Sequence, residues 1–149
     1  VIGSVHSRFS LSEKDMTARF LRAMEDPHLT IVGHPTGRLL LSREPYPVDM
    51  EALLDGAARH NVAIEINADP HRLDLDWRHL ARARALGVMI SIGADAHSIA
   101  GLRNVESGVG IARKGGLGAK DVLNSRPVEE FLRFAAARRD GTAAGQRGR

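Results

Sequence analysis

The sequence predicts an α/β fold in which parallel strands alternate with helices. Four short apolar runs are separated by windows whose apolar residues recur at helical spacing. The apolar runs are continuous and do not alternate with polar residues, which is typical of strands that helices cover. Strands that alternate with helices form a parallel sheet or barrel through right-handed crossovers. Four such units in 149 residues match half of a (β/α) barrel, which typically needs ~250 residues, and a small open doubly wound sheet is the alternative.

The first strand and the first helix have clear local signals. Residues 1–6 (VIGSVH) form an apolar strand. Ser12, followed three residues later by Asp15, resembles a capping box and begins a helix that runs to residue 25. This helix has an apolar face and ends at the pair Asp26-Pro27.

The remaining elements are predicted from the same two patterns, continuous apolar runs for strands and helical spacing of apolar residues for helices. Further strands are expected at residues 29–33, 62–66 and 88–92. Further helices are expected at residues 48–60, 76–86 and 127–138. Two connecting segments are assigned neither helix nor strand, namely a polar loop at residues 35–47 and a glycine-rich stretch at residues 108–118.

The composition excludes several classes of protein. Hydrophobic residues make up 43% and charged residues 26%, the balance of a soluble globular domain, and no apolar run approaches the ~18 residues of a membrane span. The absence of cysteine excludes disulfide scaffolds, thiolate metal sites and cysteine nucleophiles. No targeting signal precedes the first strand, so we expect a cytoplasmic protein.

The excess of positive charge lies at the C-terminus. The net charge is +3, and residues 138–149 account for it with four arginines and one aspartate. Residues 1–137 hold 17 basic and 17 acidic side chains. We therefore expect one domain over residues 1–137, without the overall positive charge of a nucleic-acid-binding domain, and a disordered tail over residues 138–149.

Polar side chains follow the predicted strands at the point where each strand ends. His6 comes at the end of the first strand, His34 follows the second, and Asp95 and His97 follow the fourth. The carboxyl ends of parallel strands meet at one edge of the sheet, where α/β proteins build their sites. Imidazole and carboxylate ligands together suit Zn, Fe or Mn. A single histidine in such a place is more often structural, but the repetition on three strands predicts a metal site.

Five segments, in their order and spacing, resemble the PHP (polymerase and histidinol phosphatase) domain. They are SVHS, GHPTGRLL, EPYPVDMEALL, EINADPHRLDL and GADAHS, and the resemblance covers about residues 1–135. The succession of GHPTGRLL, YPVD and EIN-x-x-P-x-RLD is most similar to the C-terminal PHP domain of bacterial family X DNA polymerases.

This resemblance implies both a fold and a site. The fold is a distorted (β/α)7 barrel, of which this chain holds the C-terminal part. The site holds divalent metal ions, with Mn²⁺ as the first expectation and Zn²⁺ or Fe²⁺ as alternatives. Glu65 and Asn67 match the family's E-I-N segment and are expected to support or line the site. The residues that match the family's metal ligands are His6, His34, Asp95 and His97.

The family's remaining ligands, an H-x-H pair, further histidines and a bridging glutamate, belong to upstream strands that this sequence does not contain. Because the chain opens on Val1 inside a predicted strand, we expect it to be an N-terminally truncated fragment that is inactive by itself. Its expected partners are DNA and the upstream polymerase and PHP segments of the same protein.

The function that the resemblance implies is a metal-dependent phosphoesterase that acts as a 3′–5′ exonuclease on DNA ends, with a role in DNA repair. A small-molecule phosphatase of the histidinol-phosphatase type is the alternative, and a non-catalytic structural module is the second alternative. Arg38, Arg43 and Arg72 are candidates to hold a phosphate, and surface salt bridges are the alternative role for each.

Overall fold

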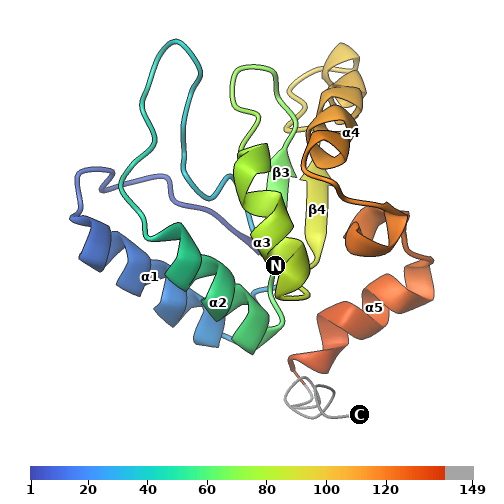
Figure 1. The fold of residues 1–149 in the computed structure, drawn as a ribbon, viewed down its shortest axis with the longest axis horizontal. Helices are drawn as coiled ribbons and strands as arrows, with labels where there is room; N and C mark the ends of the chain where they lie inside the picture. Colours follow the sequence, from blue (N-terminus) through green and yellow to red (C-terminus); the bar gives the residue numbers. More distant parts are fainter. Residues whose placement is uncertain (140–149) are drawn as a thin grey trace.

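The computed structural model describes residues 1–139, which form a four-stranded parallel sheet surrounded by helices (Figure 1). The strands pair in the order β1-β2-β3-β4, so each crossover joins neighbouring strands. The strands are β1 (Ile2–Gly3), β2 (Ile31–Val32), β3 (Ala63–Asn67) and β4 (Ile90–Gly93). The α-helices are α1 (Glu13–Glu25), α2 (Met50–His60), α3 (Leu80–Ala85), α4 (Val105–Lys114) and α5 (Val128–Ala137). The predicted α/β class with an all-parallel sheet is confirmed.

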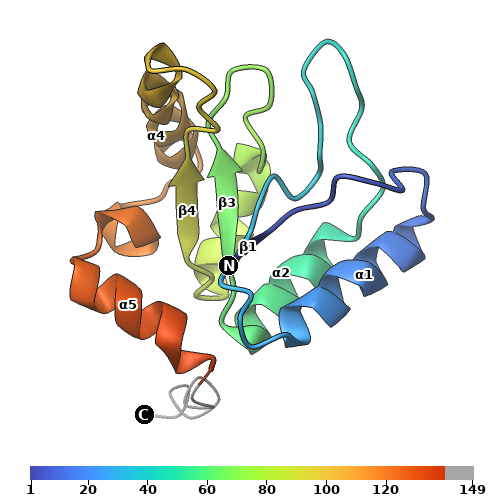
Figure 2. The same ribbon diagram turned by 180° about the vertical axis from the view of Figure 1, so that it is seen from behind.

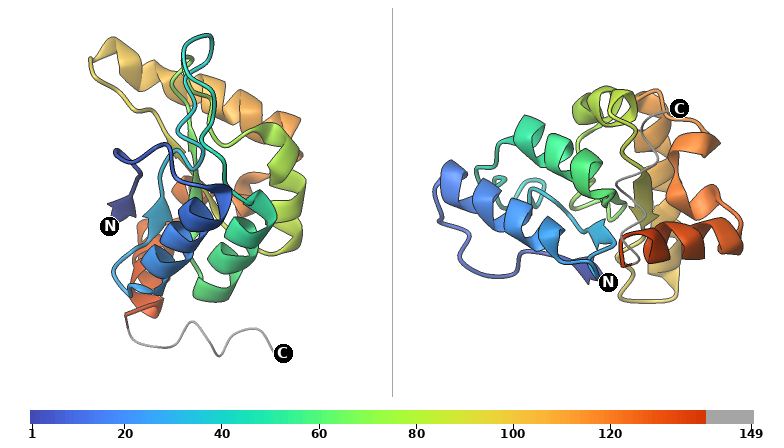
Figure 3. Two further views of the ribbon diagram at one scale, coloured as in Figure 1. Left: turned by 90° about the vertical axis from the view of Figure 1, so that its left-hand side faces the viewer. Right: turned by 90° about the horizontal axis from the view of Figure 1, so that it is seen from below.

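Helices α1, α2 and α3 cover one face of the sheet. Figure 2 shows β3 and β4 in front of α3, and both views in Figure 3 place α1 beside α2. Side chains of a strand alternate between its two faces, so Ile64 and Ile66 of β3 point toward the helices and are fully buried. Glu65, between them, points to the opposite face. The main core is therefore apolar on the helix side, and the polar residues of the strands are left for the other side.

The cap predicted for α1 is confirmed, and the structure shows a cap of the same kind on α2. Ser12 caps α1, since its hydroxyl oxygen accepts a hydrogen bond from the backbone N–H of Asp15 at 3.1 Å. Asp49 caps α2 in the same way by accepting from the backbone N–H of Ala52 at 3.0 Å. Thr17 joins the two helices, because its hydroxyl oxygen accepts from the backbone N–H of Asp49 at 2.9 Å.

The first two strands are much shorter than predicted. Instead of residues 1–6 and 29–33, only two residues of each form the ladder. At the end of β2 the backbone of His34 takes a positive φ of 28°. Its N–H donates to the carboxylate of Glu65 at 2.7 Å, so a side chain takes the place of a neighbouring strand. Each strand ends where the chain turns at the edge of the sheet that holds the carboxyl ends of the strands, which we call the rim.

The glycine-rich stretch contains a helix that the prediction omitted. Gly108 and Gly110 lie inside α4, although glycine costs a helix roughly 1 kcal/mol relative to alanine. The packing of Gly108 compensates for this cost in helix stability. A Cβ atom on Gly108 would lie 2.5 Å from Cγ2 of Ile92 and 2.8 Å from Cβ of Ala68, so only glycine lets α4 approach β4 this closely.

This contact yields a prediction on stability with a matched control. Gly108→Ala should lower the free energy of unfolding by about 1–3 kcal/mol, because the added methyl group overpacks the contact with β4. Gly110→Ala should raise the free energy of unfolding by about 0.5–1 kcal/mol, since nothing lies within 4 Å of its Cβ position. Urea unfolding of both variants checks this, and equal effects at the two positions would contradict it.

The C-terminal helix α5 packs near the ends of β2 and β3 at which these strands begin. Phe134 of α5 contacts a small cluster formed by Ile31, Ala63 and Leu123. The guanidinium of Arg138 then donates to the carbonyl oxygen of Met24. Apart from Arg138 and Arg139, the tail that is predicted to be disordered lies outside the described residues. Over the part of the chain that the structure describes, no helix has the length and apolar character needed to cross a membrane.

Candidate metal and phosphate site

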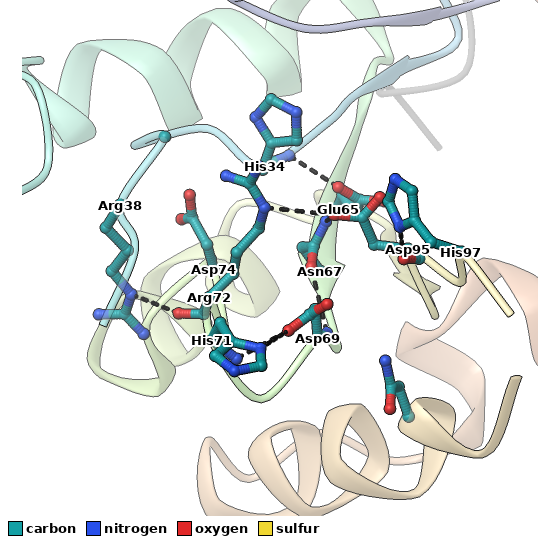
Figure 4. A network of polar contacts seen from close by, with 12 residues as sticks. His34, Arg38, Glu65, Asn67, Asp69, His71, Arg72, Asp74, Asp95 and His97 are labelled. Atoms are coloured by element: carbon teal, nitrogen blue, oxygen red, sulfur yellow. Dashed lines mark hydrogen bonds and ion pairs between the residues drawn. The ribbon is translucent and has the colours of Figure 1, made fainter. Parts of the chain in front are cut away.

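The ends of the four strands bring the predicted site residues to one edge of the sheet. His6 follows β1, His34 follows β2, and Asp95 follows β4. Asn67 is the last residue of β3, and His97 lies two residues beyond Asp95. Figure 4 shows His34, Asn67, Asp95 and His97 grouped around Glu65. Residues that are far apart in sequence therefore meet because parallel strands end together.

The two histidines at the ends of β1 and β2 are in contact. The ring centroids of His6 and His34 are 5.0 Å apart, with the planes at 88°. His6 is exposed, whereas His34 is only 8% exposed. The Nδ1 atom of His34 is buried and has no hydrogen-bond partner among the described residues. Burial, and then the nearby charge of Arg72, lower the pKa of His34, so its imidazole is neutral near pH 7 and can act as a ligand.

Glu65 holds the backbone of His34 through the hydrogen bond that ends β2. Burial raises the pKa of the Glu65 carboxyl above its usual value. The carboxyl group lies between two neighbouring strands, because a Cβ atom on Gly93 would approach its Oε1 to 2.2 Å and one on Gly33 its Oε2 to 3.4 Å. Glu65 therefore lines the site between β2 and β4, in a position that suits the supporting role expected from the sequence.

Asp95 is oriented by two partners that bind the same oxygen. Its Oδ2 accepts a hydrogen bond from Nδ2 of Asn67 at 3.0 Å and forms an ion pair with Nε of Arg72 at 3.2 Å. No described residue hydrogen-bonds to its Oδ1. The backbone of Asp95 is also unusual, with a φ of 49° that a non-glycine residue rarely adopts. One carboxylate oxygen is thus held, and the other is left for a ligand.

His97 is held in one tautomer by the backbone. Its Nδ1 lies 2.8 Å from the carbonyl oxygen of Asp95. A carbonyl oxygen can only accept, so Nδ1 carries a proton, and in the neutral form of the ring Nε2 is the nitrogen with the lone pair. Histidines that bind metals commonly use this arrangement, with one nitrogen donating to a carbonyl group and the other facing the metal.

The chemical types of these donor atoms suit a divalent metal. Neutral imidazole nitrogen and carboxylate oxygen are ligands of Mn²⁺, Zn²⁺ and Fe²⁺. Within residues 1–139, however, no group of three or more histidine or acidic side chains is arranged to hold a metal ion. Metal binding by His6, His34, Asp95 and His97 therefore stays a prediction, which the orientation of Asp95 and His97 favours.

Two of the three predicted phosphate-binding arginines are engaged within the protein. Arg38 donates from Nε to the carbonyl oxygen of Arg72 at 2.9 Å and from Nη1 to Asp76 at 3.0 Å, and its Nη2 donates to the carbonyl oxygen of Leu73. Arg43 donates from Nε and Nη2 to the carbonyl oxygen of Gly37. A phosphate-binding role for Arg38 or Arg43 stays a prediction, to which these contacts lend no support.

The loop between β2 and α2 rises beyond the strand ends as a short hairpin (Figure 1). The backbone N–H of Leu39 donates to the carbonyl oxygen of Arg43 at 2.9 Å and closes the hairpin. Its base is packed, since the rings of Phe9 and Tyr46 stack with centroids 6.0 Å apart. Its tip, Leu41, is fully exposed. The hairpin is therefore anchored at its base, and beside its tip the backbone N–H of Leu40 donates to the carbonyl oxygen of His71 at 2.6 Å.

Asp74 is a site residue that sequence reasoning missed. It is fully buried, and its carboxylate accepts a hydrogen bond from the backbone N–H of Thr36 at 3.0 Å. Because Thr36 lies two residues after His34, this bond fixes the turn that carries the histidine. A charged residue between two leucines in the segment RLDL was the available signal, because an acidic residue is seldom buried without a specific partner.

The burial of Asp74 has a consequence for pH dependence. Burial raises the pKa of its carboxyl above the usual value of 3.8, so the folded protein binds this proton more tightly than the unfolded chain. The contribution of Asp74 to the free energy of unfolding should therefore fall as pH rises from about 4 toward 7. Asp74→Asn cannot ionise and should show a smaller fall. Urea unfolding of both proteins across this range checks it, and parallel pH profiles would contradict it.

Comparisons with known proteins confirm the resemblance carried by the motifs. The chain is 43% identical, over 134 residues and 90% of its length, to the DNA polymerase/3'-5' exonuclease PolX of Bacillus subtilis (strain 168). It is 29% identical over 93% of its length to a probable phosphatase of Vibrio parahaemolyticus, and 30% identical over 87% to one of Shewanella halifaxensis. The chain spans 24% of the polymerase and 56% and 52% of the two phosphatases. No family model matches the chain.

Proposed function

We propose that this chain contributes catalytic groups to a metal-dependent phosphoesterase that hydrolyses phosphodiester bonds at DNA 3′ ends. The observation that carries the proposal is the arrangement of Asp95 and His97. Asn67 and Arg72 hold one oxygen of Asp95, and the backbone carbonyl of Asp95 fixes the tautomer of His97. Both side chains are thereby prepared to bind a cation at the rim of the sheet.

The residues of the chain have separate tasks in this mechanism. Asp95, His97, His34 and His6 would hold the metal through carboxylate oxygen and neutral imidazole nitrogen. A bound divalent metal supplies a water molecule of lowered pKa and neutralises charge on phosphate oxygens. Glu65 and Asp74 keep the turn at His34 in place through backbone hydrogen bonds. Preorganisation of this kind lowers the cost of reaching the transition state.

DNA is proposed as the substrate because the match to PolX is the one of higher identity. The name of that relative includes a 3'-5' exonuclease, and the 43% identity spans 90% of this chain. A second candidate is hydrolysis of a small phosphomonoester, which the matches to the two probable phosphatases favour. The rim residues alone serve either reaction, because both place a phosphorus centre beside the metal.

The test uses this chain and a chimera in which it replaces the matching segment of Bacillus subtilis PolX. Each protein is given a 5′-labelled single-stranded oligonucleotide and, separately, p-nitrophenyl phosphate, with Mn²⁺ and with EDTA. We expect the chimera to shorten the oligonucleotide from its 3′ end with Mn²⁺ and not with EDTA. Turnover of the monoester with no shortening of DNA would favour the phosphatase instead.

A matched pair of variants assigns the activity to this site. His34→Asn keeps a residue that tolerates positive φ and removes the imidazole, so it should abolish most of the hydrolysis. His28→Asn makes the same change on an exposed histidine beside Asp26 and should leave hydrolysis intact. Equal rates in the two variants, or no metal-dependent hydrolysis by the folded chimera, would overturn the proposal.

A further inference from the structure

The structure separates the three arginines of the rim by what their nitrogen atoms bind. All three guanidinium nitrogens of Arg38 donate within the protein, two of them to the backbone of Arg72 and Leu73. Arg43 is tied to Gly37, and its guanidinium carbon lies 4.7 Å from the ring centre of Phe9. Every guanidinium nitrogen of Arg38 is therefore occupied within the protein, and two of the three nitrogens of Arg43 are occupied by Gly37.

Arg72 differs because its terminal nitrogens have no partners. Its Nε lies 3.2 Å from Oδ2 of Asp95, which places the guanidinium inside the site (Figure 4). Its Nη1 is buried and, among the described residues, hydrogen-bonds to nothing, and no hydrogen bond from Nη2 is present in the same part of the chain. A buried charged donor without an acceptor is costly, so an unpartnered one at a site points to a missing partner, which can be a ligand, an ion or a water molecule.

The surroundings of Arg72 favour an anionic oxygen as the missing acceptor. The side chain as a whole is 19% exposed although its Nη1 is buried, and Nε of Arg38 holds the backbone of Arg72 by donating to its carbonyl oxygen. Guanidinium groups bind phosphate through two parallel hydrogen bonds from neighbouring nitrogens. The two free terminal nitrogens of Arg72 form such a pair.

We propose that Arg72 binds the phosphate group of the substrate through Nη1 and Nη2 while its Nε keeps Asp95 in place. The proposal rests on the proposed function for the identity of the substrate as a phosphate ester. It assigns the phosphate to Arg72 and leaves Arg38 as a positioning residue, which holds the backbone of Arg72. One side chain thereby links the phosphate to the carboxylate that is predicted to bind metal.

The test measures binding of inorganic phosphate to the 149-residue chain, without turnover. The Nε–H signal of Arg72 is followed by ¹H–¹⁵N NMR while phosphate is added with and without Mn²⁺, and phosphate affinity is measured by calorimetry. We expect this signal to shift in a saturable way. Arg72→Met should weaken phosphate binding roughly tenfold or more, and Arg72→Lys should weaken it less, because lysine keeps the charge and loses the paired donors.

Controls distinguish phosphate binding from a role in holding Asp95 alone. Arg82→Met removes an arginine that pairs with Glu51 and Asp55 on the helices and should leave phosphate affinity unchanged. Unchanged phosphate affinity in folded Arg72→Met, or a change confined to Mn²⁺ affinity, would overturn the proposal. If Arg72→Met does not fold, Arg72→Lys decides by the same two affinities. Phosphate binding through Arg72 in a chain whose PolX chimera hydrolyses nothing would leave this inference standing and refute the proposed function.

Discussion

Asp95→Asn in the PolX chimera is expected to lower DNA 3′-end hydrolysis at least about 100-fold, since even residues that only support a metal ligand cost 10–100-fold when replaced. The change removes the charge of the one carboxylate that both Asn67 and Arg72 orient. Nucleotide addition by the polymerase part should stay near the level of the unchanged chimera. His97→Ala should behave in the same way. Both activities are measured on the same labelled primer.

The control for this result is Asp55→Asn, which makes the same chemical change on α2. Asp55 pairs with Arg82 on the helix side of the sheet, away from the strand ends, so hydrolysis should be unchanged. Equal loss of hydrolysis and nucleotide addition in folded Asp95→Asn would show that the residue serves the structure of the whole protein. That outcome would remove Asp95 from the site.

Leu54→Ala is expected to cause the largest loss of stability that we predict. Leu54 lies on α2, is fully buried and belongs to the main core that joins α1, α2 and β3. Truncation leaves a cavity, and such changes lower the free energy of unfolding by about 2–5 kcal/mol. Leu102→Ala makes the same change on a side chain that is 61% exposed and should cost less than about 0.5 kcal/mol. Urea unfolding followed by circular dichroism measures both, and a similar loss in both variants would contradict the assignment of the core.

The fold class was predictable because the spacing of apolar residues along the sequence indicates which side chains are buried. Val62, Ile64 and Ile66 of the strand predicted at residues 62–66 lie in the main core, as does the apolar face of α1. The sequence could not reveal α4, because its glycines lower helix propensity and only the close contact with β4 compensates. The early end of β2 was also hidden. It depends on a hydrogen bond between His34 and Glu65, which are 31 residues apart.

The site was predictable in its residue types and in its place, but not in its internal contacts. The placement of polar residues after each strand is a local pattern, and it brings His34 and Asp95 to the same rim. Which arginine has free nitrogens depends on loop geometry that no local pattern encodes. The role of Asp74 was hidden for the same reason, because its partner Thr36 comes from a different loop.

The hairpin between β2 and α2 offers a position for a spectroscopic label. Leu41 at its tip is fully exposed, and the chain contains no cysteine, so Leu41→Cys would carry a fluorophore or a spin label at a single site. The packing of Phe9 against Tyr46 holds the base of the hairpin, which limits the motion of the label. A spin label there would sense a paramagnetic Mn²⁺ ion at the strand ends as a change in its relaxation. Metal occupancy could thus be followed in solution without any substrate.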